Sequence, residues 1–221
     1  MCSTIVFAIS LFAISSAVGE PIRLDLLRRG GTGDAEAFQE ICDCLGDGYV
    51  AGADEVALRP PGTEAERADR VCTFLGKFHE CLVGKIENSP GPVKKIMYLS
   101  AAYEYQHLYI AQQVGLCSNV PIMPIKTIAE NSGIMEQGGW KKIDGKPEKC
   151  VADRMRHCFS NMELSFEGQN NKVNPSFQYL ECYEAEVPEP ACDPPSKILE
   201  AFEYNGRKIV KVEWDRIQGR K

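Results

Sequence analysis

The chain has 221 residues, a formal net charge of −6 at neutral pH and a sequence pI of about 5.2. A chain this acidic repels nucleic acid, so we expect no nucleic-acid partner. The length suffices for one large domain or two small ones.

The first 19 residues predict a secretory signal peptide. They contain no charged residue, and 5–14 is a nearly unbroken apolar run. Ala17 and Gly19 are small residues at the −3 and −1 positions of a cut before Glu20. The run is shorter than the roughly 20 residues of a transmembrane helix. We therefore expect a secreted, extracellular protein without a transmembrane segment; a buried N-terminal helix is the alternative.

Removal of the signal peptide, which contains Cys2, leaves nine cysteines. In an exported protein such cysteines form a disulfide framework. The odd number leaves one thiol free or bonded to another chain, so a disulfide-linked dimer is one expected form. The nine are Cys42, Cys44, Cys72, Cys81, Cys117, Cys150, Cys158, Cys182 and Cys192.

Residues 20–33 are predicted to be a flexible lead-in to the first helix. That helix begins at Asp34, which can cap it, and buries a stripe that includes Cys42. Gly46 and Gly48 are expected to end it. Cys42 and Cys44 point to different neighbours, since they lie about 200° apart around such a helix.

The second helix, 63–86, is the element to which we expect the others to be tied. Thr63 and Glu66 have the spacing of a capping box. Cys72 and Cys81 lie nine residues apart, or about 13 Å along the axis. A disulfide requires Cα atoms about 5.5 Å apart, so each cysteine must bond outward.

A third helix is predicted over 92–114, with Gly115 as its stop. It carries four tyrosines, which allow two interpretations. In one, tyrosines help to line a pocket for a small apolar ligand. In the other, which we favour, tyrosine rings pack inward and keep their hydroxyls in water. The candidate pocket residues are Met97, Tyr98, Tyr105 and Leu82.

The three predicted helices suggest how the first cysteines group. If each helix runs antiparallel to the next, Cys42, Cys44, Cys72 and Cys117 gather at one end. Cys81 then lies at the other end and is the candidate for the odd thiol.

Residues 118–148 form a connector rich in proline and glycine. It joins the halves 34–117 and 149–206 of the disulfide-rich region 34–206. The connector is long for a loop inside a compact domain. It therefore either holds short helical turns or marks a boundary between the halves.

The second half reads as an antiparallel helical hairpin, with arms at 149–166 and 175–186. Folding it about residue 170 places Cys158 opposite Cys182. The same fold places Cys150 opposite Cys192. We therefore predict the disulfides Cys158–Cys182 and Cys150–Cys192.

A last helix is predicted over 196–204. Asn205-Gly206 either caps it or forms a hairpin turn, and we prefer the capped helix. Val210, Val212 and Trp214 then alternate with charged residues, which is a strand pattern. We expect 207–221, a basic segment with a net charge of +4, to be an extended tail.

The segment RVCTFLGKFHECL resembles the cysteine-rich helical domains of unknown function found in secreted nematode and arthropod proteins. The resemblance covers Cys42 to Cys117. It implies an all-α fold and secretion, and it brings no activity.

We expect an all-α, disulfide-stapled bundle of about five or six helices. None of the three histidines, His79, His107 and His157, has metal-ligand spacing with another, and no nucleophile or phosphate-loop motif is present. We therefore expect no cofactor, no metal site and no enzymatic activity. The leading hypothesis is a non-catalytic extracellular interaction protein with an unknown protein partner. The alternative is a carrier of a small apolar ligand.

Overall fold

In the computed structural model, residues 32–58, 62–88, 95–136, 139–167, 182 and 192–217 are described. These residues form helices and no strands, which confirms the all-α expectation. The elements are α2 (Thr32–Leu58), α3 (Glu64–Asn88), α4 (Lys95–Gln113), α5 (Met123–Asn131), α6 (Lys149–Glu167), α8 (Lys197–Tyr204), the π-helix η2 (Asn205–Lys211) and α9 (Val212–Ile217). The predicted signal peptide 1–19 lies outside the described residues.

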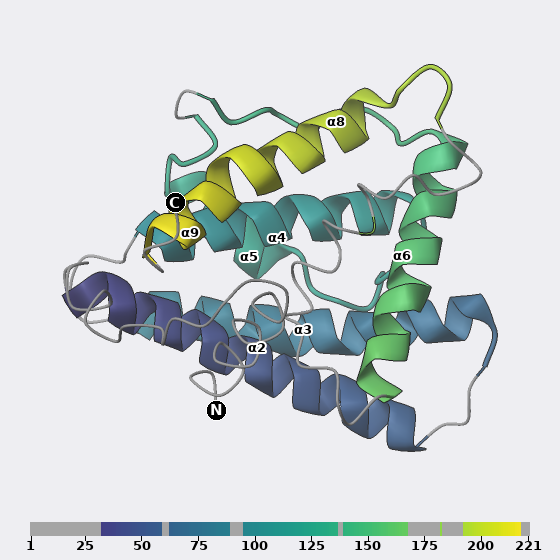
Figure 1. Ribbon diagram of the computed structural model, residues 1–221, viewed down its shortest axis with the longest axis horizontal. Coiled ribbons are helices and arrows are strands. Elements are labelled where there is room, and N and C mark those ends of the chain that lie inside the picture. The colour runs from purple at the N-terminus through teal and green to yellow at the C-terminus, as the bar shows by residue number, and fades with distance from the viewer. Residues whose placement is uncertain are drawn as a thin grey trace, which may run out of the picture.

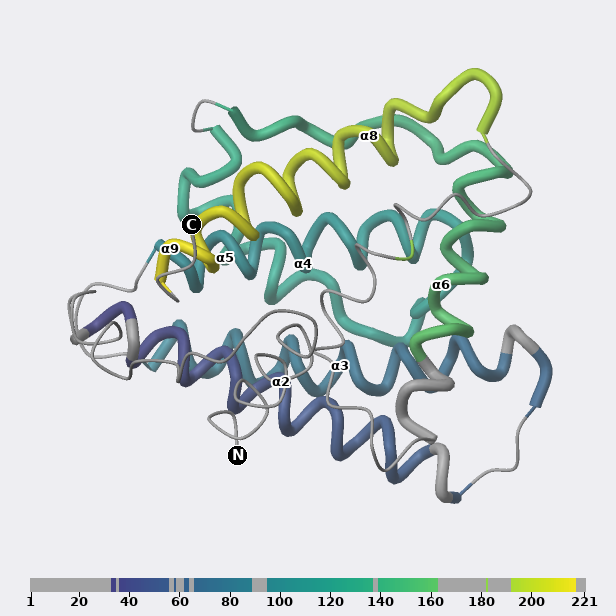
Figure 2. The backbone as a smooth tube through the Cα atoms, in the orientation of Figure 1, coloured from purple at the N-terminus to yellow at the C-terminus, as the bar shows by residue number. Residues whose placement is uncertain are grey.

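The helices pack as two antiparallel layers closed at one end by α6 (Figures 1 and 2). α2 lies along α3 in one layer, and α4 lies with α5 and α8 in the other. α6 crosses the end of both layers and packs mainly on α3. One hydrophobic cluster runs from Ala37 to Ile217, so the two predicted halves share a core.

α2 is longer than the sequence suggested, because Gly46 and Gly48 lie inside it rather than at its end. A Cβ on Gly48 would lie 2.9 Å from the backbone oxygen of Phe74 in α3. Glycine at this position therefore allows α2 and α3 to cross closely. The expectation that the glycines end the helix was wrong, since the helix continues to Leu58.

α3 begins as its sequence predicts. The backbone N–H of Thr63 donates to Glu66 Oε2 at 2.6 Å, and the Glu66 N–H donates to Thr63 Oγ1 at 3.4 Å. This reciprocal pair is the predicted capping box. The predicted apolar stripe is buried, with Val71, Cys72 and Leu82 fully enclosed.

The segment after Tyr204 is helical, so the prediction of an extended tail was wrong for 207–217. Val210, Trp214 and Ile217 are buried at helical spacing. Trp214 packs on Phe38 of α2, with 4.5 Å between ring centroids. Burial against α2 therefore overrides the alternation of this segment.

Both predicted disulfides of the second half, Cys158–Cys182 and Cys150–Cys192, are present. Of the predicted second arm, 175–186, only Cys182 is among the described residues. In the connector, α5 provides the short helix that was one of the two alternatives.

In the first half, Cys72 is bonded to Cys117 and Cys44 to Cys81. Cys81 is therefore not the odd thiol, and Cys42 is disulfide-bonded as well. The grouping was right to bring Cys72 and Cys117 together. It was wrong for Cys44 and Cys81, because α2 extends to Leu58. Its added turns run beside the start of α3, which leaves Cys44 opposite the later part of α3.

Candidate functional site

Two histidines and a glutamate meet in the interior between α3 and α4. His79 lies nine residues before the end of α3, and Glu104 lies nine residues after the start of α4. Because the two helices are antiparallel neighbours, these positions face each other. His107 follows Glu104 by three residues, a spacing that puts both on one side of α4.

The three side chains contact each other inside the core. His79 Nε2 lies 3.4 Å from Glu104 Oε2, and His107 Nδ1 lies 3.7 Å from the same oxygen. The exposed fractions are 3% for His79, 6% for Glu104 and 1% for His107. We call these residues the His–Glu–His cluster.

Aromatic rings from the second half close the cluster. The His107 ring centroid lies 5.6 Å from that of Phe159 in α6 and 5.3 Å from that of Phe202 in α8. Tyr103 stacks on Phe202, with 4.7 Å between ring centroids. The cluster therefore lies between α3 and α4, where aromatic side chains of α6 and α8 also contact it.

The electrostatics of the cluster favour an ionised carboxylate. Burial alone would raise the pKa of Glu104, but the polar contacts and the charge interactions with His107 and His79 outweigh it and lower that pKa to about 2. Hydrogen bonds to the charged form of an acid act in this direction. Glu104 is therefore an anion throughout the neutral range.

The cluster can hold a proton but is not arranged as a metal site. Both imidazoles approach the same carboxylate oxygen, His79 Nε2 at 3.4 Å and His107 Nδ1 at 3.7 Å. Across the described residues, no group of three or more His, Cys, Asp or Glu side chains is placed to hold a metal ion. The expectation of no cofactor stays a prediction.

Sequence reasoning considered the histidines one by one and missed the cluster. The Glu-x-x-His spacing of Glu104 and His107 was a local signal. The third member, His79, requires the pairing of α3 with α4. Matching positions about the turn between these helices would have placed His79 opposite Glu104.

A second feature is the outward face of α2, where exposed residues recur every three or four positions. This row of exposed residues runs from position 36 to position 58, a span of 22 positions, or about 33 Å of helix. We call it the α2 outer stripe. Its members are Glu36, Gln39, Asp43, Asp47, Val50, Asp54 and Leu58.

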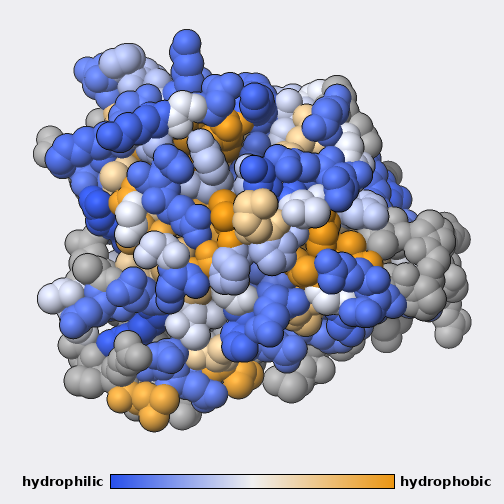
Figure 3. Space-filling model, turned by 180° about the vertical axis from the view of Figure 1, so that it is seen from behind, coloured by the Kyte–Doolittle hydropathy of each residue, from blue (hydrophilic) through white to orange (hydrophobic). Residues whose placement is uncertain are grey.

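The α2 outer stripe combines negative charge with exposed apolar side chains. α2 as a whole contains seven carboxylates and no basic residue. Within the described part of the chain, no salt bridge engages Asp43, Asp47 or Asp54. Val50 is 50% exposed and Leu58 79% exposed. In Figure 3, hydrophobic side chains also reach the surface near the end of the molecule where α2 stops.

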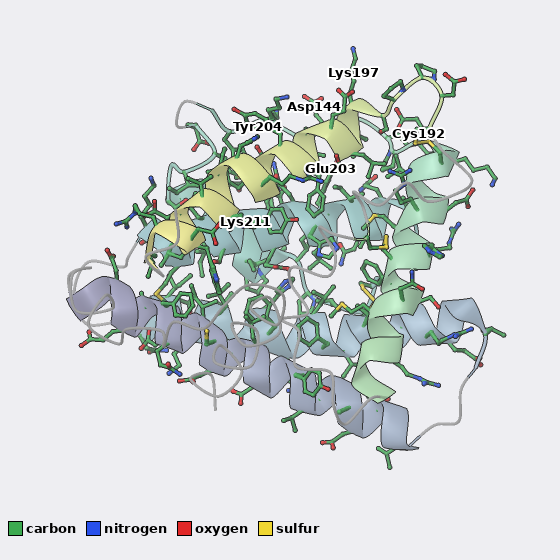
Figure 4. The ribbon with its side chains drawn as sticks, viewed as in Figure 1. Asp144, Cys192, Lys197, Glu203, Tyr204 and Lys211 are labelled. Carbon is green, nitrogen blue, oxygen red and sulfur yellow. A yellow bond between two sulfur atoms is a disulfide. The ribbon has the colours of Figure 1, made fainter. Side chains whose placement is uncertain are left out.

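A third polar arrangement is structural and holds 140–148 on the bundle. Asn205 accepts from the Lys141 N–H at 2.8 Å and donates to the Lys141 carbonyl at 2.7 Å and to Gln106 Oε1 at 2.9 Å. The Lys141 ammonium lies 4.3 Å from the Tyr204 ring centroid. Figure 4 shows Tyr204 on α8 along the same edge as Asp144 of this segment.

The residues proposed to line a ligand pocket belong to the core and its margin. Leu82 of α3 and Met97 of α4 are buried. Tyr98 and Tyr105 are partly buried and pack against the core. Burial, with smaller effects of Glu130 and Tyr109, raises the pKa of Tyr105. The apolar-ligand carrier stays a prediction.

No helix in the described part of the chain has the length and apolar character needed to cross a membrane. Comparison with known proteins finds no matching family model, no similar curated protein and no similar solved structure.

Proposed function

We propose that the chain is a secreted, non-catalytic extracellular interaction protein that binds its partner through the α2 outer stripe. The observation that carries the proposal is the make-up of this stripe. It presents Asp43, Asp47 and Asp54 without salt-bridge partners in the described residues, beside the exposed side chains of Val50 and Leu58.

Secretion is supported by the disulfides. Four pairs link eight of the described cysteines, and such frameworks persist in oxidising compartments. The predicted signal peptide agrees with that setting. The cysteines in these pairs link helices through sulfur–sulfur bonds. The His–Glu–His cluster is enclosed by aromatic rings.

The chemistry of the stripe selects the kind of partner. Carboxylates along one helix face attract lysine and arginine side chains and steer their approach. Exposed ion pairs contribute only about 0–1 kcal/mol each, so apolar contacts must supply much of the affinity. The fitting partner is a protein segment that forms a basic amphipathic helix, with apolar side chains that reach Val50 and Leu58.

The test uses as its probe a helical peptide with one lysine face and one leucine face. The triple variant Asp43→Asn, Asp47→Asn, Asp54→Asn removes three charges from the stripe. We expect it to weaken peptide binding by about tenfold or more and to flatten its dependence on salt. Calorimetric titration at two salt concentrations measures both effects.

The control removes the same number of charges from other faces. Glu87, Glu136 and Glu200 are exposed, and their replacement by glutamine leaves the stripe intact. We expect binding within about twofold of the unmodified chain, since remote surface charges are largely screened. Equal losses in the two triple variants would show non-specific attraction and would overturn the proposal.

The apolar part of the stripe is tested separately. Leu58→Ser removes the most exposed large apolar side chain of α2 and leaves every charge in place. We expect weaker peptide binding with an unchanged salt dependence. Unchanged affinity would mean that the stripe acts only as a charged surface.

A further inference from the structure

We propose that the 140–148 segment is a cleavage site, at which a trypsin-like serine protease hydrolyses the peptide bond after Lys142 and converts the chain into a two-chain protein. Water adds its hydroxyl group to the Lys142 carbonyl carbon and a proton to the Ile143 nitrogen, which gives a new carboxyl end and a new amino end. The inference does not depend on the function of the α2 outer stripe. It rests on the exposure of the segment, on the different contacts of Lys141 and Lys142, and on the positions of the disulfides.

The first observation is that the 140–148 segment is surface backbone outside any helix. It connects α5 to α6, and within it only Ile143 is buried. Gly145 adopts a positive φ of 92°, which marks a bend in the segment. Exposed irregular segments are the places where proteases cut folded proteins most readily. The segment therefore offers a protease more accessible backbone than the helices on either side of it.

The second observation is that Lys141 is held on the bundle. Its backbone N–H donates to Asn205 Oδ1 at 2.8 Å, and its carbonyl accepts from Asn205 Nδ2 at 2.7 Å. Its ammonium group lies 4.3 Å from the Tyr204 ring centroid. While these contacts last, neither the side chain nor the carbonyl of Lys141 is available to a protease.

Lys142, in contrast, extends into the solvent. Its side chain is 85% exposed, and its ammonium group lies 3.9 Å from the carboxylate of Asp144, which is 77% exposed. An ion pair between such exposed groups contributes about 0–1 kcal/mol, so it does not hold the lysine in place. Trypsin-like proteases bind a basic side chain in a pocket that has a carboxylate at its base. Lys142 presents the group that such a pocket recognises.

The other lysines near this position suit such a protease less well. Lys146 precedes Pro147, whose ring fixes the backbone and whose nitrogen carries no hydrogen. Lys149 lies in the first turn of α6 and forms an ion pair with Asp153. Across 140–149, the contacts therefore select the bond that follows Lys142.

The third observation concerns the disulfides. The four cysteines after Lys142 bond to one another, so none of them links the two products. These bonds are Cys150–Cys192 and Cys158–Cys182. Non-covalent contacts do cross the cut, because Trp214 packs on Phe38 and the two parts of the chain share one hydrophobic cluster. We therefore expect the cleaved protein to remain folded as two chains held together by the core.

The direct test is limited digestion of the intact, oxidised protein with trypsin, followed by mass spectrometry of the unreduced products. We expect a product that begins at Ile143 to form faster than one that begins at Lys142. Lys142→Gln should slow formation of the product that begins at Ile143 by at least about tenfold, since the pocket loses its cation. Cleavage elsewhere in the chain while the bond after Lys142 stays intact would overturn the proposal.

Lys146→Gln is the matched control, because it removes the same charge from the same exposed segment. We expect it to leave the rate of cleavage after Lys142 within about twofold of that in the unmodified chain. Equal slowing by Lys142→Gln and Lys146→Gln would show that the charge of the segment, and not the Lys142 side chain, directs the protease, and would overturn the assignment.

Asn205→Ala tests why Lys142 is preferred to Lys141. A protease needs extended backbone on both sides of the bond, so cleavage follows the population of molecules in which the segment has left the bundle. Loss of the Asn205 hydrogen bonds should increase that population and speed cleavage by about tenfold or more. It should also raise the share of cleavage after Lys141. An unchanged ratio of the two cuts would show that Asn205 does not protect Lys141.

Size-exclusion chromatography of the digested protein tests the two-chain form. Under native conditions the two products should elute together at the position of the uncut chain. In denaturant without a reducing agent they should separate, because no cysteine after Lys142 bonds to one before it. Products that separate under native conditions, or that stay linked in denaturant, would contradict the two-chain form.

Discussion

Trp214 packs its ring against Phe38 with 4.5 Å between centroids, and so joins the last described helix of the chain to the first. Replacement of a buried tryptophan by alanine loses this contact and leaves a cavity. Trp214→Ala should therefore lower the free energy of unfolding by about 3–5 kcal/mol. Denaturant titration followed by circular dichroism measures the change.

Val212 provides the control on the same helix, since it is 57% exposed. Val212→Ala should change the free energy of unfolding by less than about 0.5 kcal/mol. If both variants had small effects, α9 would not be packed on α2 as described.

The two glycines of α2 predict opposite effects of alanine. A Cβ on Gly48 would meet the Phe74 backbone oxygen at 2.9 Å, whereas a Cβ on Gly46 would have nothing within 4 Å. Gly48→Ala should destabilise the fold by about 1–3 kcal/mol. Gly46→Ala should stabilise it by up to about 1 kcal/mol, because alanine is the better helix former. Thermal unfolding of the two variants gives the comparison, and equal shifts would refute the close crossing of α2 and α3.

Removing the Asn205 side chain should release the 140–148 segment. Asn205→Ala deletes the partner of both backbone groups of Lys141 and of Gln106. We expect a loss of about 2–3 kcal/mol in unfolding free energy and faster hydrogen exchange in 140–148. Asn119→Ala, at an exposed position, is the control and should have little effect on either measurement.

Glu104 predicts how stability depends on acid. Its pKa is lowered from 4.5 to about 2 in the folded protein. A lowered acid pKa stabilises the fold above the unfolded value and loses that contribution as the pH falls from 4.5 toward 2. The contribution is on the order of 3 kcal/mol. Across this pH window, the free energy of unfolding should fall less steeply with decreasing pH in Glu104→Gln than in the unmodified protein. An equally steep fall in the variant would contradict the lowered pKa of Glu104.

Glu203 should behave in the opposite way. Burial, opposed by Arg154 and assisted by Glu200, raises its pKa. A raised acid pKa means that ionisation disfavours the fold at neutral pH. Glu203→Gln should therefore leave stability at pH 7 unchanged or higher, and a clear loss would show that the carboxylate has a stabilising partner.

The disulfides show how far sequence patterns reach. Cys150–Cys192 and Cys158–Cys182 were predicted by folding one helical hairpin about its turn, so that positions equally far from the turn lie opposite each other. That prediction requires only the helical periodicity of the arms and the position of the turn. The same reflection would have paired Cys44 with Cys81 if the length of α2 had been known. The length was misjudged because glycine ends some helices and, as Gly48 does here, permits close contact in others.

The tail shows a second limit. Val210, Val212 and Trp214 fit a strand by their alternation, while Val210, Trp214 and Ile217 fit a helix. The choice depends on whether Phe38 is available to cover Trp214, and that contact spans nearly the whole chain. The His–Glu–His cluster was missed for a different reason. The antiparallel pairing of α3 with α4 was expected, but polar positions were not matched about the turn between them, which would have set His79 opposite Glu104.

The most direct test of the proposed function is a residue-resolved map of where the basic amphipathic peptide binds. We would titrate it into the ¹⁵N-labelled, fully oxidised protein and follow backbone amide shifts. The account predicts saturable shifts concentrated in 36–58, along the α2 outer stripe, with weaker effects at higher salt. Shifts centred on α6 or α8, or shifts that do not saturate, would contradict it.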